Sequence, residues 1–198
     1  MQKIINTLYY ISGRIYIPSS LLNVKNIILH ISDTPSNIYP EIIRLVKKLT
    51  PDYIIHTGDV VDNVKLELYP FKLKQYENLS SDFISNLSPY VKNEIIIVPG
   101  NHDNPYCLKK LPKVKLINEG EILTIDNISI GLAHKFNNLP SKKCNFYLYG
   151  HDRSLSSYQF LNGITYINII ELKTNKVFHL KYPINTDSYR LLRTKIGM

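Results

Sequence analysis

Three segments in the first half of the chain are continuous apolar runs that end abruptly at polar residues, as buried strands of a parallel sheet do. They span residues 26–32, 53–57 and 95–98. Between them, apolar residues recur at helical spacing over 40–49 and 82–91, with Pro40 suited to a first helical turn and Ser81 to an N-cap. This alternation of strand and helix is typical of an α/β fold.

The second half of the chain is richer in strands, because short apolar runs follow one another with turn residues between them. These runs lie at 114–117, 121–125, 128–134, 145–149, 157–161, 164–170 and 177–182. The last two predict a hairpin across residues 173–176. A strand–helix half followed by a strand-rich half predicts an α/β fold in which two sheets form a β-sandwich flanked by helices.

The two ends of the chain lie outside this pattern. Residues 1–24 precede the first core strand as an extension, within which 7–11 and 14–17 flank a Ser-Gly pair and predict a short hairpin. Residues 184–198 carry Arg190, Arg193 and Lys195 and predict a basic tail, either a short helix or a loose segment. No internal repeat or linker is visible, so we expect one domain over 1–198.

Composition adds a modest constraint on partners and compartment. The chain has 24 Lys and Arg against 16 Asp and Glu, a net charge of +8, which suits a nucleotide or nucleic acid but is better explained by solubility. Cys107 and Cys144 occur without any Cys-x-x-Cys pattern, so we expect free thiols in a reducing compartment. We find no membrane-spanning run and no secretory signal pattern, and therefore expect a cytoplasmic protein without membrane contact.

Polar residues with metal-binding side chains follow five of the predicted strands. They are Asp33, Asp59, the pair Asn101-His102, His134 and His151. Carboxylate, amide oxygen and imidazole together are the ligands that divalent ions such as Mn²⁺, Fe²⁺ and Zn²⁺ prefer. Parallel strands deliver such residues to one edge of a sheet, so the sequence predicts a metal site there.

These motifs, in this order, resemble the calcineurin-like metallophosphoesterases, particularly their small single-domain phosphodiesterases. The family series of Asp-x-His, Gly-Asp-x-x-Asp, Gly-Asn-His-Asp, a separate His and Gly-His-x-His falls over residues 33–153. The resemblance implies a four-layer arrangement of two sheets and flanking helices. It also implies metal ligands at Asp33, Asp59, Asn101, His134 and His151, with His102 as the catalytic residue that assists the leaving group.

The first and last motifs of the series each lack one histidine. Pro35 replaces the histidine of Asp-x-His, and Arg153 replaces the second histidine of Gly-His-x-His. In the family both imidazoles bind the first metal, so the resemblance leaves that site with only Asp33 and the shared Asp59. Neither proline nor a protonated guanidinium can coordinate a metal. The second site keeps its full ligand set of Asp59, Asn101, His134 and His151.

Three consequences of these losses stay open at this point. In the first, the enzyme works with one tightly held ion or recruits a second ion weakly. In the second, Arg153 takes the place of the first ion and either pairs with Asp33 or binds a phosphate through two hydrogen bonds. In the third, catalysis is lost and the fold serves as a protein- or nucleic-acid-binding module. Arg153 is equally well explained as a surface cation. His102 has no evident use in a module without catalysis, so we expect an active enzyme.

We therefore predict a metal-dependent phosphoesterase that uses a metal-activated water, most plainly a phosphodiesterase. Asn101 and Arg153 are the expected phosphate-binding residues. Mn²⁺ is the first choice of cofactor, with Fe²⁺, Ni²⁺ or Zn²⁺ as alternatives and one or two ions per chain. The partner is a phosphate-ester substrate, with a nucleotide or nucleic acid favoured by the lysine-rich loops.

Other polar residues near these motifs have simpler explanations. His30 and His56 lie inside apolar strands and are expected to be buried core residues with satisfied hydrogen bonds. Asp62 and Asp103 are expected to orient their loops through hydrogen bonds and not to bind metal.

Overall fold

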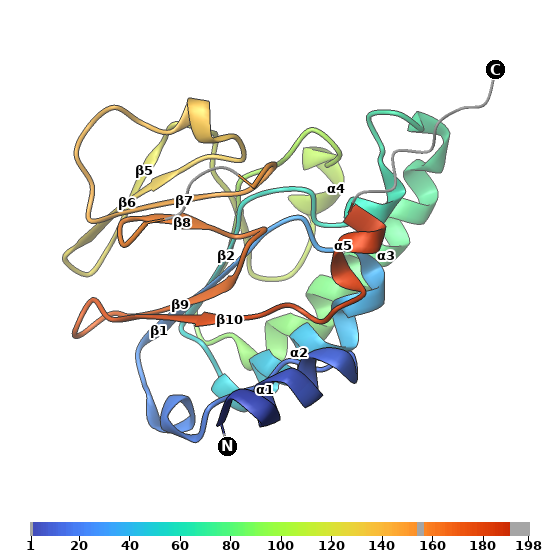
Figure 1. Ribbon diagram of the computed structural model, residues 1–198. Helices are drawn as coiled ribbons and strands as arrows, with labels where there is room; N and C mark the ends of the chain where they lie inside the picture. Colours follow the sequence, from blue (N-terminus) through green and yellow to red (C-terminus); the bar gives the residue numbers. More distant parts are fainter. Residues whose placement is uncertain (1, 154–156, 191–198) are drawn as a thin grey trace.

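The computed structural model describes residues 2–153 and 157–190, which form two mixed sheets packed face to face (Figure 1). Helices cover the outer face of the larger sheet. The predicted α/β sandwich of two sheets with flanking helices is therefore confirmed. Among these residues, no helix combines the length and apolar character that crossing a membrane requires.

The larger sheet has six strands in the order β10-β9-β1-β2-β3-β4. Their bounds are β1 (Ile27–Ile31), β2 (Tyr53–His56), β3 (Ile95–Ile97), β4 (Val114–Leu116), β9 (Ile167–Glu171) and β10 (Val177–Leu180). Strands β1 to β4 are parallel, and β9 runs antiparallel to both β1 and β10. The predicted hairpin is thus present as β9–β10.

The smaller sheet has four strands in the order β5-β6-β7-β8. Their bounds are β5 (Ile122–Ile125), β6 (Ile128–Leu132), β7 (Phe146–Tyr149) and β8 (Phe160–Asn162). Alternate residues of a strand point to opposite faces, so Ile28, Ile55 and Ile96 of the larger sheet meet Phe146 and Leu148 between the two sheets. This shared apolar layer fixes the position of one sheet on the other.

The opposite face of the larger sheet packs on helices, which is why its strands are apolar on both sides. Helices α2 (Tyr39–Leu49) and α3 (Leu73–Leu87) form most of this layer; the other described helices are α1 (Gln2–Ile11), the short α4 (Pro105–Leu108) and α5 (Thr186–Arg190). Leu29 and Ile54 face this layer, where the rings of Tyr39 and Phe83 stack with centroids 3.8 Å apart.

The predicted N-terminal hairpin is wrong, because residues 2–11 form helix α1. The Ser-Gly pair that suggested a turn is instead the helix end: Gly13 has φ +73°, its N–H donates to the Tyr10 carbonyl, and the Arg14 N–H donates to the Tyr9 carbonyl. This pair of bonds is a Schellman motif, which satisfies the last carbonyls of a helix. The following predicted strand, 14–17, is irregular chain.

Three further expectations need correction at their edges. Helix α3 begins at Leu73, so Ser81 lies within the helix and does not cap it. The outer face of the smaller sheet is covered, among the described residues, by a loop instead of α-helices; Phe136 from this loop packs its ring on those of Tyr149 and Phe160. Helix α5 occupies part of the predicted tail, whereas Arg193 and Lys195 lie outside the described residues.

Candidate metal centre

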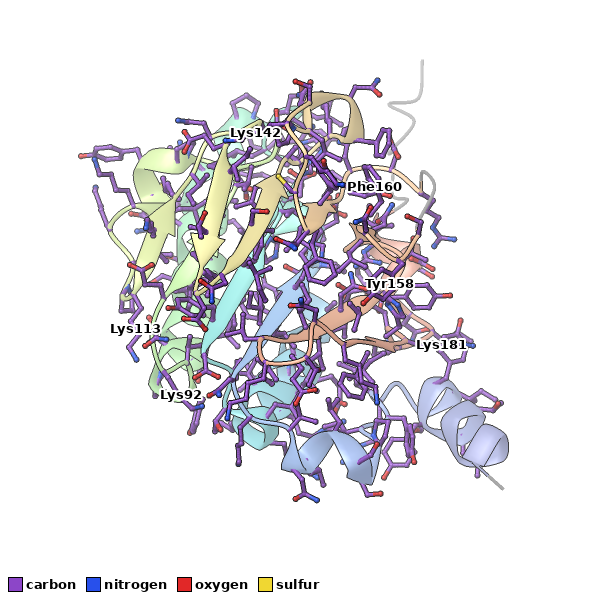
Figure 2. The ribbon with its side chains drawn as sticks, turned by 90° about the vertical axis from the view of Figure 1, so that its left-hand side faces the viewer. Lys92, Lys113, Lys142, Tyr158, Phe160 and Lys181 are labelled. Atoms are coloured by element: carbon purple, nitrogen blue, oxygen red, sulfur yellow. The ribbon has the colours of Figure 1, made fainter. Side chains whose placement is uncertain are left out.

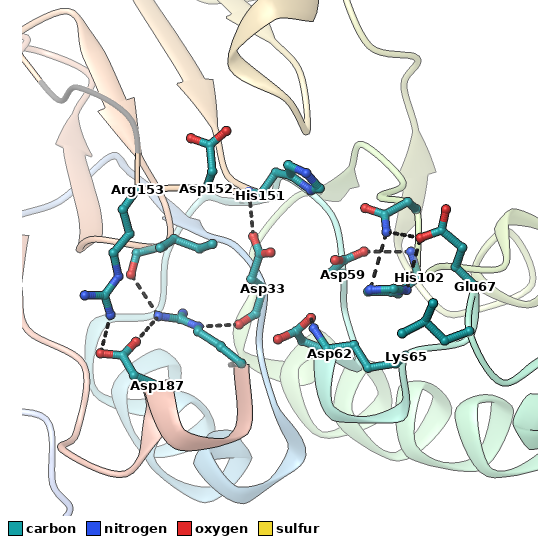
Figure 3. Close-up of a pocket in the computed structure, with 14 residues that line it drawn as sticks. Asp33, Asp59, Asp62, Lys65, Glu67, His102, His151, Asp152, Arg153 and Asp187 are labelled. Carbon is teal, nitrogen blue, oxygen red and sulfur yellow. Dashed lines mark hydrogen bonds and ion pairs between the residues drawn. The ribbon is translucent and has the colours of Figure 1, made fainter. Parts of the chain in front are cut away.

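The parallel strands β1, β2 and β3 end side by side, which brings their following loops to one place (Figure 3). A cavity of about 610 Å³ opens there. Its walls include the predicted residues Asp33, Asp59, Asn101, His102, His151 and Arg153. The remaining predicted ligand, His134, is buried at the same place, 3.0 Å from the ring of His151. All the predicted site residues are thus brought together.

The free ring nitrogen of His134 lies close to the donor atoms of three other side chains. Its Nδ1 lies 2.7 Å from the carbonyl of Thr57, which can only accept, so Nδ1 carries the proton and Nε2 is free to bind a cation. That Nε2 lies 3.1 Å from Asn101 Oδ1, 3.0 Å from His151 Nδ1 and 3.7 Å from Asp59 Oδ2. These converging donor atoms, from Asp59, Asn101, His134 and His151, fit a divalent ion.

Two glycines make the close approach of these loops possible. A Cβ on Gly58 would overlap Nδ1 of His134, and one on Gly100 would overlap Oδ1 of Asp59. Gly58 also has φ +99°, a conformation that glycine adopts without strain. The Gly-Asp and Gly-Asn motifs therefore have a steric reason as well as a chemical one.

Asp103 holds these loops in place, as the sequence analysis expected. Its carboxylate accepts hydrogen bonds from the backbone N–H groups of Asp59, Val60 and Gly100, at 2.7, 2.9 and 2.8 Å. It also accepts one from the hydroxyl of Tyr76 at 2.8 Å. Asp59 has φ +56°, an uncommon conformation that these bonds stabilise.

The electrostatics of the cavity favour a bound cation. Burial raises the pKa of Asp59 well above its ordinary value, and the nearby carboxylates of Asp33, Asp103 and Asp62 raise it further. Burial also raises the pKa of Asp62 to about 6. Grouped acids of this kind resist ionisation together unless a positive charge joins them.

His102 lies beside this group with its ring in the cavity wall. Its backbone N–H donates to Asp59 Oδ1 at 2.9 Å, and its Nδ1 lies 3.8 Å from the carboxylate of Glu67. Burial, aided by the positive charge of Lys65, lowers the pKa of His102 to about 4, so without a bound ion the ring is neutral near pH 7. Glu67 also accepts from Asn101 Nδ2 at 2.6 Å and was not foreseen, because its segment has no periodic pattern.

The first metal site of the family series is incomplete in the structure. The Asp33 carboxylate accepts hydrogen bonds from the Ser32 hydroxyl and from the backbone N–H of His151. Pro35 begins a 3-10 turn and supplies no ligand atom. Arg153 pairs with Asp187 of α5 and not with Asp33, so one of the alternatives left open for it is removed; its side chain is 59% exposed.

A different arginine reaches this half of the site from the C-terminal helix. Arg190 is buried, and its guanidinium donates to the backbone carbonyls of Asp33, Ser32 and Ile164 at 2.7, 3.0 and 2.8 Å. The sequence predicted Arg190 only as part of a basic tail. Its place in the site could not be foreseen, because only the tertiary fold brings α5 to the end of β1.

The prediction of buried histidines with satisfied hydrogen bonds is confirmed for His30 and confirmed only in part for His56. His30 is bonded at both ring nitrogens, with Nε2 3.0 Å from Thr57 Oγ1 and Nδ1 3.1 Å from Asn168 Nδ2. His56 is buried with Nε2 2.9 Å from Thr34 Oγ1, but its Nδ1 has no partner within the described part of the chain.

The site and the fold together define a divalent-metal centre at the strand ends of an α/β sandwich. The family model for calcineurin-like phosphoesterases matches residues 27–193, and the chain belongs to this family. It is therefore a metal-dependent phosphoesterase by family, a class of hydrolase. No curated protein matched the chain in the comparison made.

Solved structures with a similar course of the chain include three from bacteria. The chain shares 15% identity with the phosphoesterase Yfce from E. coli, covering 79% of this chain and 98% of that one, with a TM-score of 0.49. The protein AQ665 of unknown function from Aquifex aeolicus shares 18% identity, covering 78% of this chain and 96% of that one, with a TM-score of 0.44. The nuclease MPE from Pseudomonas putida shares 14% identity, covering 71% of this chain and 66% of that one, with a TM-score of 0.41.

Proposed function

We propose that the protein is a phosphodiesterase that hydrolyses a phosphate diester with one divalent ion held by Asp59, Asn101, His134 and His151. The observation that carries this proposal is the convergence of their donor atoms beside His102 in one cavity. Mn²⁺ is the ion we favour for this mixed set of oxygen and nitrogen ligands, with Fe²⁺, Ni²⁺ and Zn²⁺ as alternatives.

The roles of the side chains follow from their positions. A divalent ion at these ligands lowers the pKa of a water molecule and polarises a phosphoryl oxygen. Thr57 fixes the tautomer of His134 through its carbonyl, and Asp103 fixes the loop that carries Asp59. His102, held at the cavity wall by its N–H bond to Asp59, donates a hydrogen bond from its neutral ring that stabilises the charge on the phosphoryl group or on the departing oxygen.

A nucleotide or nucleic-acid diester is the substrate class that we propose. Lys92, Lys113, Lys142 and Lys181 lie apart around the face in Figure 2, so they do not form one continuous basic path. Arg153 lines the cavity and is exposed enough to meet a phosphate, although it must then share its charge with Asp187.

Cys107 and Cys144 are free thiols, which supports our proposal of a cytoplasmic location.

The test compares hydrolysis of bis-p-nitrophenyl phosphate, a diester, with p-nitrophenyl phosphate, a monoester, while Mn²⁺ is titrated in. We expect the diester to be cleaved faster, with a rate that saturates with metal. His102→Ala should lower kcat by about 10²–10³-fold, as loss of a hydrogen-bond donor to the developing charge does. His179→Ala is the matched control, because His179 is an exposed histidine of β10 that bonds Asn168.

The opposite outcomes are equally informative. Full turnover in His102→Ala would remove the role given to His102. No hydrolysis of either ester with Mn²⁺, Ni²⁺, Fe²⁺ or Zn²⁺ would overturn the proposal. The losses at Pro35 and Arg153 would then favour a family member that binds a protein or nucleic acid without catalysis.

A further inference from the structure

A second group of potential ligands shares Asp59 with the first. Single donor atoms of Asp59, Asp62 and His102 all lie within 4.8 Å of one another, and all three side chains are buried. Such a group, next to the first and joined to it by one aspartate, is where a two-ion site would place its other ion. The family series does not provide this set, because it draws the first site from Asp33 and two imidazoles.

Lys65 already occupies this second group with its own positive charge. Its ammonium forms an ion pair with Asp62, and its side chain is only 13% exposed. The lysine follows the 3-10 turn Asp62–Val64 with φ +52°, and it lines the cavity. In Figure 3, Lys65 and Asp62 lie together below Asp59.

We infer that the Lys65 ammonium takes the place of a second metal ion, so that the protein binds a single divalent ion at Asp59, Asn101, His134 and His151. This inference rests on the proposed function and adds the residue that excludes a second ion. An ammonium among these ligands repels a divalent ion at short range. It also supplies three N–H donors, which suit the oxygens of a phosphate.

The rest of the incomplete site agrees with a single ion. The Asp33 carboxylate is already bonded to the Ser32 hydroxyl and the His151 N–H, and the buried Arg190 guanidinium lies against its backbone. The two positions that would add imidazoles carry Pro35 and Arg153. The residues present on the Asp33 side of the cavity therefore supply no replacement for the two missing imidazole ligands.

The test measures bound metal and needs no turnover. The full chain and its variants are dialysed against Mn²⁺ over a range of concentrations, and Mn²⁺ per chain is determined by mass spectrometry. We expect one ion in the wild type and one in Lys65→Arg. We expect a second, weaker ion in Lys65→Met, because the neutral side chain leaves Asp59, Asp62 and His102 without a cation. Two Mn²⁺ ions sharing an aspartate would also show magnetic coupling in the electron paramagnetic resonance spectrum.

Lys74→Met is the matched control, because Lys74 is an exposed lysine that pairs with Glu77 on α3; it should keep one ion. Two ions in the wild type would overturn the inference, and so would a single ion in a folded Lys65→Met. If Lys65→Met does not fold, the wild type and Lys65→Arg still decide the matter by their stoichiometry. Failure of the proposed function would appear differently, as absent hydrolysis in a protein that binds its metal.

Discussion

The histidines of this chain show how one residue type serves two purposes. His134 has its Nδ1 proton directed to a carbonyl and its Nε2 lone pair directed to the other ligands. His30, by contrast, has both nitrogens engaged by Thr57 and Asn168 in the core. The two histidines differ in what surrounds the second ring nitrogen, which the sequence does not show directly. The sequence distinguished them only by position, because His134 ends its predicted strand whereas His30 lies inside one.

Burial of His30 predicts a measurable dependence of stability on pH. Its pKa is lowered from 6.5 to about 3 by loss of solvation. Because the unfolded chain takes up this proton near pH 6.5 and the folded chain does not, the stability that His30 provides is complete above pH 6.5 and is lost as the pH falls towards 3. His30→Gln, which keeps a donor and an acceptor, should remove this dependence.

The measurement is the free energy of unfolding in urea with a chelator present, at several pH values between 6 and 4. Between the wild type and His30→Gln, the slopes should differ by about 1.4 kcal/mol per pH unit, one proton's worth. The raised pKa values of Asp59 and Asp62 act in the opposite sense but are common to both proteins. Parallel curves would contradict the assignment.

The elements that sequence reasoning placed correctly are those with an unambiguous apolar pattern. Strands β1, β2 and β3 are buried on both faces, and their continuous apolar runs follow directly from that. Helix α1 was missed because a Ser-Gly pair suits a hairpin turn and a helix end alike. Lys65 and Glu67 lie in a segment without periodicity, so nothing local marked them as part of the site.

The loops after β2 and β3 depend on glycine for a reason that can be tested by a matched pair. Gly58 and Gly13 both have positive φ, but a Cβ at Gly13 would meet nothing within 4 Å, whereas one at Gly58 would strike His134 and Gly100. Gly13→Ala should therefore cost only the backbone strain, about 1–2 kcal/mol. Gly58→Ala should cost more and should also abolish high-affinity Mn²⁺ binding.

Urea unfolding and calorimetric titration with Mn²⁺ measure the two effects separately. Gly13→Ala should bind Mn²⁺ as the wild type does, because Gly13 lies at the end of α1. Wild-type metal affinity in Gly58→Ala would show that the two loops do not need their close approach.

Across the chain as a whole, helix α5 is joined to the loop after β1, which carries Asp33 of the site. Arg190 joins α5 to Ser32, Asp33 and Ile164 through three backbone carbonyls. Lysine cannot reproduce this fork of donors, so Arg190→Lys should destabilise the protein by about 2–3 kcal/mol. Because Arg153 is exposed and its ion pair with Asp187 lies at the surface, Arg153→Lys should change stability by less than about 1 kcal/mol.

Chemical unfolding of the two variants beside the wild type checks this contrast. Equal stabilities would mean that α5 does not hold the loop after β1. The sequence could not reveal this contact, since Arg190 and Asp33 are far apart along the chain and meet only when the domain is complete.

The most direct test of the account is the rate of diester hydrolysis after the metal has been removed and returned. The chelator-treated wild type should be inactive towards bis-p-nitrophenyl phosphate, and added Mn²⁺ should restore a rate that saturates at one ion per chain. Asp59→Asn should stay inactive at any Mn²⁺ concentration, because it removes the carboxylate shared by both ligand groups. Hydrolysis that persists without metal, or that Asp59→Asn retains, would contradict the account.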